Sequence, residues 1–337
     1  MLADCYGLDT ALIPARHQPL LLLEHAGQQA INSHVLLKGS GLFEADLQGG
    51  ERQLSPAQLL TLLGNIARQR DGREASFLLG QQWLPGHYGN ASLALTQAGN
   101  LQQALDILQA HQAVLCPLLG PRYRVEAGQL MVYWTDSCGA ASLLPFLVEL
   151  HMTALTALCR WQSGQRLPWH YRFNRTPPQQ LAHHQVHLGP HLQWNSQFDC
   201  MLLDAAWLQQ PWPRGNERSA TMALRPIEAS AGQRSLLQAL YDYLLLHIRQ
   251  APVLEDTAAA FGVSPATFKR HLARHHTHFQ AQLDQVRTHV AICLMHYHGM
   301  NHSQLADYLG YHDARNFRRS FQRWTGLPAL PAALVQV

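Results

Sequence analysis

The feature that most constrains the fold is a short helical pattern that occurs twice in the last hundred residues. The first copy runs from residue 253 to 276 and the second from 303 to 324. Each copy combines an apolar helix, a glycine-containing tight turn and a second helix with Lys or Arg on its polar face. This is the sequence form of a helix-turn-helix, whose second helix fits the DNA major groove. Two copies in one chain predict a monomer that reads two successive grooves.

The first copy has a turn and a helix cap in the expected places. Gly262 permits the positive φ of the turn, Ser264 can cap the next helix, and Pro265 suits its first turn. Phe268 and Leu272 then point inward at helical spacing. We expect the remaining positions to face outward and to contact DNA, with small side chains near the helix start and cations further along. These positions are Ala266, Thr267, Lys269, Arg270 and Arg274.

The second copy repeats this logic with a different outer face. Gly310 makes the turn, Asp313 can cap the helix, and Phe317 and Phe321 face inward. Arg can pair with guanine and Asn with adenine, and each good pair contributes about 1–3 kcal/mol of discrimination. An amphipathic helix over 279–295 joins the copies and can hold them about 34 Å apart, one turn of DNA. The predicted DNA contacts of this copy are Ala314, Arg315, Asn316, Arg319 and Arg323.

The charge of the chain is concentrated at the same end. Residues 1–231 carry 15 Lys and Arg against 16 Asp and Glu, whereas residues 232–337 carry 10 against 6 and also ten of the 21 His. Phosphate contacts supply most of the salt-dependent affinity for DNA, so a basic domain suits a polyanion binder. The alternative is a plain helical bundle with basic outer faces. The second copy, the joining helix and the charge asymmetry together disfavour it.

The two copies also resemble a known family. Residues 236–328, and above all LADYLGYHDARNFRRSFQRWTGLP, are similar to the DNA-binding domain of the AraC/XylS family of transcriptional regulators. The resemblance implies base-facing residues at 266, 267, 269 and 270 in the first unit and at 314, 315, 316 and 319 in the second. The family places a Tyr soon after its Trp-Thr-Gly turn, and this chain lacks it after Leu327-Pro328. We therefore expect a final helix that is shorter or differently packed.

The preceding two thirds of the chain mix helical and alternating patterns. Helices are predicted at 56–66 with Ser55 as cap, at 101–114 with Asn100 as cap, at 143–161 and at 177–184. Strands are predicted at 122–125 and 130–134 around a hairpin turn, and at 169–173, 192–194 and 198–203. The expected architecture is an α+β domain over 1–208, a Pro- and Gly-rich linker over 209–232, and an all-α domain with two helix-turn-helix motifs over 233–337.

The α+β part has a resemblance of its own. QQWLPGHYGNASLALTQAGNLQQALDILQAH and FDCMLLDAAWLQQPWP are similar to the sensor half of one branch of the same family. That branch includes regulators of amino-acid catabolism or virulence rather than the sugar-binding cupin type. The resemblance implies an effector-sensing or dimerising domain. The implied partners are double-stranded DNA, RNA polymerase, an amino-acid-like or fatty-acid-like small molecule, and a second copy of the chain.

Other sequence patterns concern the redox state of the cysteines, membrane insertion and cofactors. The six Cys form no CxxC pair and read as buried, reduced thiols of a cytoplasmic protein. Apolar runs such as 19–23 are too short to span a bilayer, and the first residues lack the pattern of a signal peptide. No Walker A, HExxH or GxSxG motif occurs, so no cofactor is expected.

Two groups of side chains have competing interpretations. We interpret His183, His184, His187 and His191 as packed or solvated rather than metal-binding, because Gly189-Pro190 ends the helix and no Cys or carboxylate lies nearby in sequence. Five aromatic residues either line an apolar effector pocket or, more often for such positions, belong to the core. They are Trp83, Tyr88, Trp134, Trp169 and Tyr171.

The leading hypothesis is a sequence-specific transcriptional regulator controlled by a small molecule at the N-terminal domain. One alternative is a DNA-binding regulator without an effector, whose N-terminal domain only dimerises. The other is an enzyme within 1–208 fused to a nucleic-acid-binding tail, which requires a cleft with convergent polar groups and perturbed pKa values.

Overall fold

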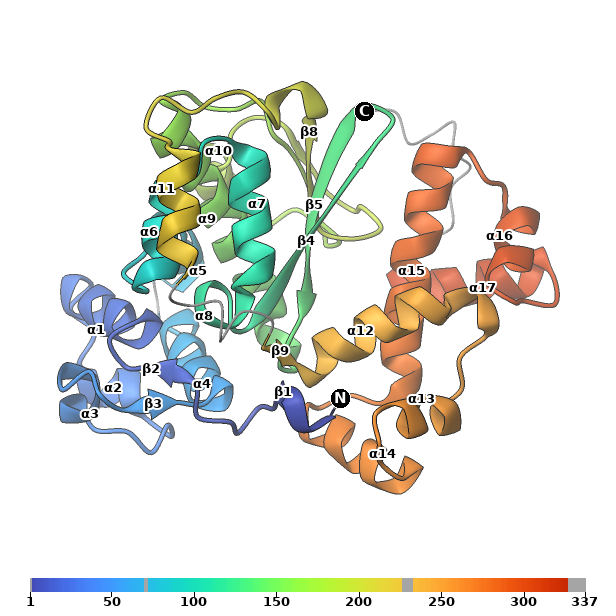
Figure 1. Cartoon of the computed structure of the whole chain (residues 1–337), viewed down its shortest axis with the longest axis horizontal. Helices are drawn as coiled ribbons and strands as arrows, with labels where there is room; N and C mark the ends of the chain where they lie inside the picture. Colours follow the sequence, from blue (N-terminus) through green and yellow to red (C-terminus); the bar gives the residue numbers. More distant parts are fainter. Residues whose placement is uncertain (1, 70–71, 226–232, 327–337) are drawn as a thin grey trace.

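A five-stranded sheet lies at the centre of the computed structural model, which describes residues 2–69, 72–225 and 233–326 (Figure 1). We call the first two stretches the N-terminal region and the third the C-terminal region. The strand order is β4-β5-β8-β6-β7, and all neighbours are antiparallel except the parallel pair β6–β7 at the edge. The strands are β4 (Leu119–Glu126), β5 (Gln129–Asp136), β6 (His170–Arg172), β7 (Leu192–Gln193) and β8 (Cys200–Asp204).

The predicted hairpin is confirmed and forms the longest pair of the sheet. Glu126 pairs with Gln129 across a two-residue turn. Both turn residues have positive φ, 50° at Ala127 and 76° at Gly128, which is the type I′ geometry that suits the twist of a hairpin.

Eleven helices of the described residues belong to the N-terminal region. The predicted caps are confirmed: the side chains of Ser55 and Asn100 accept backbone hydrogen bonds at the starts of α4 and α7. The helices are α1 (Gln18–Gln28), α2 (Ser33–Leu37), α3 (Glu44–Gln48), α4 (Pro56–Ala67), α5 (Gly72–Trp83), α6 (Asn90–Thr96), α7 (Leu101–Ala110), α8 (Gln112–Leu115), α9 (Leu144–Ser163), α10 (Ala182–His187) and α11 (Glu217–Leu224).

Two predicted helices differ in extent. The helix expected over 101–114 breaks at His111 into α7 and α8. The helix expected over 177–184 is displaced and runs from Ala182 to His187.

Helix α9 with the turn before it, Ala141–Ser163, is long and apolar enough to cross a membrane by length and composition alone. Most of its apolar window, 61%, is buried inside the protein, and it packs along α5. A core helix meets the same criteria. The helix itself was predicted, over 143–161.

The stretch predicted as a linker contains a packed helix. The backbone N–H groups of Trp212 and Asn216 donate to the carbonyls of Gly99 and Gln97, both at 2.7 Å. Helix α11 then packs against α6, so residues up to Leu224 are part of the N-terminal region. The remainder of the predicted linker, 226–232, lies outside the described residues.

The C-terminal region is helical, as expected. It holds α12 (Leu236–His247), α13 (Leu254–Ala260), α14 (Pro265–Arg274), α15 (Phe279–His298), α16 (His302–Tyr308) and α17 (Ala314–Thr325). The first unit is α13 with α14, the second is α16 with α17, and α15 joins them (Figure 1). The expectation for the final helix concerns residues after Gly326, which lie outside the described residues.

Two short strand pairs also occur in the described residues: β1 (Cys5–Tyr6) with β9 (Arg234–Ser235), and β2 (Ile13–Pro14) with β3 (Gln53–Leu54).

The central strands β5 and β8 are buried on both faces, and the two faces pack against different cores. Leu130 and Val132 of β5 pack with the helices of the N-terminal region. Met131 and Tyr133, together with Leu202 of β8, pack with the helices of the C-terminal region. Alternate residues of a strand point to opposite faces, so one strand contributes to both cores. The two regions therefore meet across a shared sheet (Figure 1).

Candidate nucleic-acid interface

Helix α14 of the first unit has one buried and one open face. The Ser264 hydroxyl accepts a hydrogen bond from the Thr267 N–H at 3.2 Å, and Phe268 and Leu272 are fully buried. The hydroxyl of Thr267 also lies 3.0 Å from that of Ser264, which leaves Thr267 half-buried. The other predicted contacts are exposed: Ala266, Lys269, Arg270 and Arg274.

Helix α17 of the second unit is capped more strongly. The Asp313 carboxylate accepts from the Asn316 N–H at 2.7 Å, and this hydrogen bond lowers the pKa of Asp313. The Asn316 amide also lies 3.3 Å from that carboxylate. Phe317 and Phe321 are fully buried, and Ala314 is half-buried. The remaining predicted contacts are exposed: Arg315, Asn316, Arg319 and Arg323.

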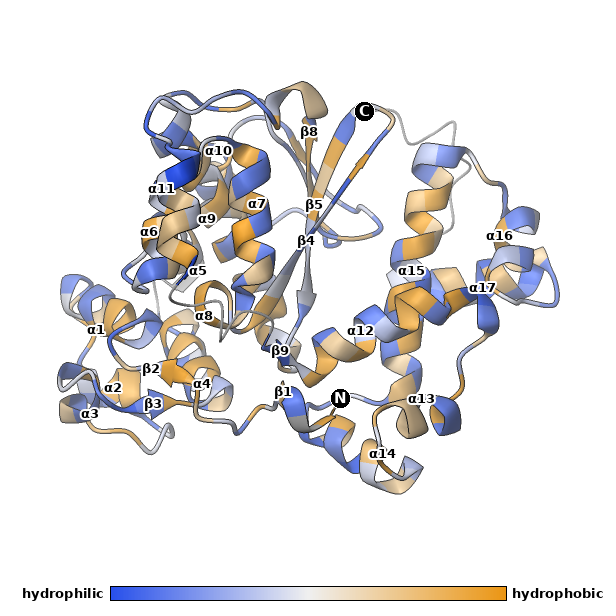
Figure 2. Cartoon of the chain, in the orientation of Figure 1, coloured by the Kyte–Doolittle hydropathy of each residue, from blue (hydrophilic) through white to orange (hydrophobic). Residues whose placement is uncertain are grey.

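The two units share one scaffold and sit at opposite ends of α15 (Figure 1). Both turns use a glycine with positive φ, 74° at Gly262 and 72° at Gly310. Figure 2 shows apolar residues along the middle of α15 and a mixture of hydrophilic and hydrophobic residues on α14 and α17. With 20 residues, α15 spans about 30 Å, close to the 34 Å turn of DNA. This geometry suits two helices that enter successive major grooves.

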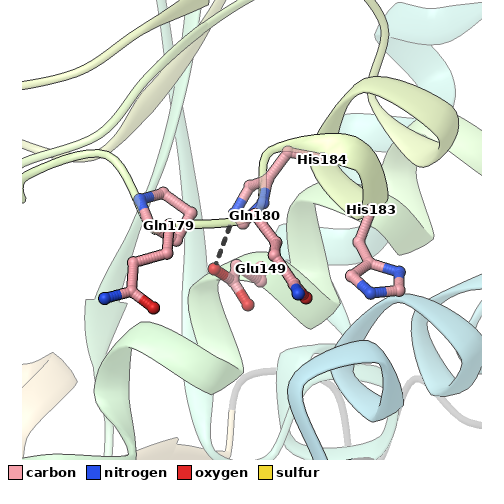
Figure 3. A pocket seen from close by; sticks show the side chains of 6 residues that line it. Glu149, Gln179, Gln180, His183 and His184 are labelled. Carbon is pink, nitrogen blue, oxygen red and sulfur yellow. Dashed lines mark hydrogen bonds and ion pairs between the residues drawn. The ribbon is translucent and has the colours of Figure 1, made fainter.

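A hollow of about 390 Å³ opens in the N-terminal region beside α9 and α10 (Figure 3). Glu149, Gln179, Gln180 and His183 are among the residues that line it. The Glu149 carboxylate accepts hydrogen bonds from Arg175 at 2.6 Å and from the Ser76 hydroxyl at 2.9 Å. This carboxylate is thus already paired with groups of the protein itself.

The histidines near this hollow pack as the sequence analysis expected, but with carboxylate partners. His184 Nε2 lies 2.9 Å from Glu149 Oε1, and His187 stacks on the Phe77 ring at 5.0 Å. Glu74 of α5 lies 3.4 Å from His183. Neither carboxylate was foreseeable, because the fold brings them from distant segments. Over the described ranges, no three His, Cys, Asp or Glu side chains are grouped to hold a metal ion.

Two family models match the chain. A helix-turn-helix domain matches residues 257–330, and a model described as the arabinose-binding domain of AraC transcription regulators, N-terminal, matches residues 31–212. The second match alone spans more than half of the chain. The chain belongs to the AraC family. It is accordingly a DNA-binding transcriptional regulator with an N-terminal ligand-binding domain.

Known relatives of this AraC-family chain are regulators too. It is 25% identical over 260 residues to the ornithine utilization regulator of Pseudomonas aeruginosa, covering 74% of this chain and 75% of that protein. It is 22% identical over 320 residues to an uncharacterized HTH-type transcriptional regulator of Mycobacterium bovis, covering 91% and 92%. The crystal structure of the transcriptional regulator CdpR from Pseudomonas aeruginosa superposes with a TM-score of 0.39 at 18% identity, over 91% of this chain and 95% of that one.

The five aromatic residues singled out in this AraC-family sequence are core residues. All five are at most 9% exposed and belong to the core of the N-terminal region. Tyr88 also borders a second hollow of about 410 Å³, with Arg16, His17 and Glu24 on its rim. Burial lowers the pKa of His17 to about 4, so this side chain is neutral at physiological pH.

One feature of the AraC-type interface was missed. Arg323 lies 3.5 Å from Asp284 of α15, although its side chain remains 68% exposed. This partner comes from another helix and carries no sequence signal. Arg318 is exposed on α17 beside the predicted contacts, as the spacing of the inward-facing phenylalanines indicates.

Proposed function

We propose that this regulator binds double-stranded DNA through the outer faces of α14 and α17. The contacts in the first unit are Ala266, Thr267, Lys269, Arg270 and Arg274, and those in the second are Ala314, Arg315, Asn316, Arg319 and Arg323. The observation that carries the proposal is the pair of capped, basic helices with open polar faces at the two ends of α15. In this proposal the regulator acts in the cytoplasm together with RNA polymerase.

Selection from random DNA, followed by gel-shift assays at several salt concentrations, tests this proposal. We expect one bipartite, asymmetric site, because the outward residues of the two units differ. A protein that enriches no sequence, or binds all DNA equally at moderate salt, contradicts it.

We further propose that the N-terminal region binds an amino-acid-like effector. One observation supports this: a relative is named for ornithine utilization. The hollow lined by Glu149, Gln180 and His183 is the candidate site for such a ligand. A ligand of the native state raises the unfolding temperature. A thermal-shift series with ornithine, other amino acids and fatty acids tests this. A higher unfolding temperature with amino acids supports the proposal, one with fatty acids only indicates the other ligand class, and no change with any compound indicates a regulator without an effector.

The proposal divides the chain into an effector domain and a DNA-binding domain. The effector domain extends through α11, and the DNA-binding domain begins near residue 233. The proposed function includes no catalysis: the Glu149 carboxylate beside the hollow is occupied by Arg175 and His184. A monomer accounts for one bipartite site and a homodimer is the alternative assembly; light scattering of the full chain with and without DNA distinguishes the two.

A further inference from the structure

A buried network of hydrogen bonds joins the C-terminal region to the sheet. Gln238 of α12 is 1% exposed, and its amide donates to the Thr135 hydroxyl and the Ser137 hydroxyl, both at 2.9 Å. Its carbonyl oxygen accepts from Arg122 of β4 at 2.8 Å. Arg122 also pairs with Asp242 at 2.5 Å. A buried amide with every group paired fixes position, because losing any partner leaves an unsatisfied polar group.

The same network requires a glycine on the sheet. A methyl group on Gly120 of β4 would overlap the side-chain amide of Gln238. The φ of Gly120 lies outside the left-handed region, so the strand itself would accept alanine. The absence of a side chain at this position therefore serves the contact between the two regions and not the strand.

The linking helix α15 is held along its length. Near its middle, the His289 ring bonds to the Tyr241 hydroxyl at 2.9 Å and lies edge-on to Tyr133 of β5 at 5.1 Å. Near its end, His296 lies 2.9 Å from Gln129, and His298 lies 2.5 Å from Glu126. These contacts run along the β4–β5 hairpin. A helix pinned at several points cannot bend or rotate freely.

The first unit has its own contact with the N-terminal region. His275, at the end of α14, is 3% exposed and lies 3.3 Å from the Cys138 carbonyl. Gly139 lies so close that a methyl group there would overlap the His275 carbonyl. The polar face of α14 stays open, so this attachment does not cover the DNA-facing residues.

We propose that the sheet sets the spacing and relative orientation of the two DNA-reading helices, and that Gln238 and Gly120 are positioning residues for DNA recognition. This rests on the proposed DNA reading. The regions share a sheet, the joining helix lies along a rigid hairpin, and the attachment leaves both reading faces open. The contact of the C-terminal region with the sheet thus affects the relative position of the two DNA-reading helices and does not block their DNA-facing sides. An effector that shifts β4 or β5 would change the distance between the readers.

The variant Gly120→Ala isolates this attachment. The added methyl meets the Gln238 amide, so we expect the C-terminal region to separate from the sheet while each region stays folded. Gly27→Ala is the matched control, because Gly27 is exposed on α1 with no atom near a new methyl group. Gln238→Ala removes the amide itself. If the two residues act through one contact, Gly120→Ala adds little in the Gln238→Ala background.

Two measurements follow for each full-length variant. Hydrogen exchange reports release of β5 and α15. Gel shifts on the site selected by the wild-type protein, and on copies with one base pair added or removed between its halves, report spacing preference. The wild type and Gly27→Ala should prefer the selected spacing by at least about fivefold, the lower end of typical coupling between sites. In Gly120→Ala and Gln238→Ala that preference should fall close to one.

The spacing ratio distinguishes positioning from simple loss of stability, because a smaller folded fraction weakens all three DNA fragments equally. Retention of the wild-type ratio in a variant whose sheet exchanges faster overturns the inference, as does a variant that changes neither measurement. If Gly120→Ala fails to fold, Gln238→Ala decides alone. If the wild type selects no sequence, the proposed DNA reading falls, and faster exchange in Gly120→Ala would still show the docking contact by itself.

Discussion

The two reading units have the same scaffold but different surroundings. The first unit ends in His275, which packs on the loop after β5 of the N-terminal region. The second unit packs on α15, where Arg287 and Tyr311 stack at 5.3 Å. The outer face of the first carries two small side chains and three cations, and that of the second carries Asn316 and four Arg. The first unit thus contacts the N-terminal region directly, whereas the second unit packs on α15.

This difference assigns separate tasks to the units. The second unit offers more side chains that can read base edges, since Arg and Asn form bidentate pairs with guanine and adenine. The first unit receives any movement of the sheet directly through α12 and α14. We therefore expect the second unit to supply most of the sequence discrimination and the first to supply most of the control.

Truncating the core of each unit should produce the largest effects and separate their stabilities. Phe268 and Phe317 are both fully buried, so alanine at either position should destabilise its unit by about 3–5 kcal/mol. Phe317→Ala should remove exchange protection from α16 and α17 and leave the sheet protected. Phe268→Ala should also weaken the sheet, because α14 is attached to it. Equal exchange patterns in the two variants would contradict the unequal attachment.

Acidification should loosen the attachment of α15 before it affects the second unit. Burial, and then Arg122, lower the pKa of His289 from 6.5 to about 3, so the folded protein holds it neutral. The unfolded chain binds this proton below pH 6.5 and the native state does not, so stability falls as pH drops from 6.5 toward 3. The loss reaches several kcal/mol at the acid end.

Unfolding in denaturant at pH 7, 6 and 5 measures this dependence. His289 faces Tyr133, Phe198 and Tyr241 from the surrounding elements, together with Arg122. His289→Gln should flatten the dependence without abolishing it, since the pKa of buried His151 is also lowered, to about 4. A slope that is unchanged in His289→Gln would show that other groups govern the pH dependence.

Removing base-reading side chains should have intermediate effects that differ between the units. Arg319→Ala and Asn316→Ala should each weaken binding to the selected site by about 1–3 kcal/mol, with a much smaller loss on random DNA. Arg274→Ala, a predicted contact outside the base-facing set, should weaken binding to both DNAs alike and reduce the salt dependence, as expected for a phosphate contact. Gel shifts on both DNAs over a salt series check this. Equal losses on both DNAs for Arg319→Ala would place its contact on the backbone.

The periodic elements were predictable from sequence, and the contacts between the regions were not. Caps at Ser55, Asn100, Ser264 and Asp313, and the hairpin before Gln129, depend on residues close in sequence. These are local signals with local causes. The outward positions of both reading helices follow from the same periodicity, and their role in DNA binding stays a prediction.

The shared sheet escaped prediction for a physical reason. Continuous burial of β5 shows that both of its faces are covered, but a sequence does not name the element that covers each face. Gln238 and Gly120 are unremarkable in sequence and acquire their role only when α12 is placed on β4. The Pro- and Gly-rich composition of 209–232 favoured a linker, yet Asn216 caps helix α11 there and tertiary packing holds it.

The smallest effect should come from the ion pair between Arg323, on the outer face of the second unit, and Asp284 of α15. Asp284 lies 3.5 Å from Arg323, whose side chain is largely exposed, so the pair itself contributes at most about 1 kcal/mol to stability. Asp284→Asn removes a negative charge near the DNA-facing side and frees Arg323 for phosphate. We expect somewhat tighter DNA binding, a steeper salt dependence and an unfolding temperature that is nearly unchanged. Arg323→Ala combined with Asp284→Asn should abolish this gain; if the gain persists, it comes from the lost charge of Asp284 and not from the release of Arg323.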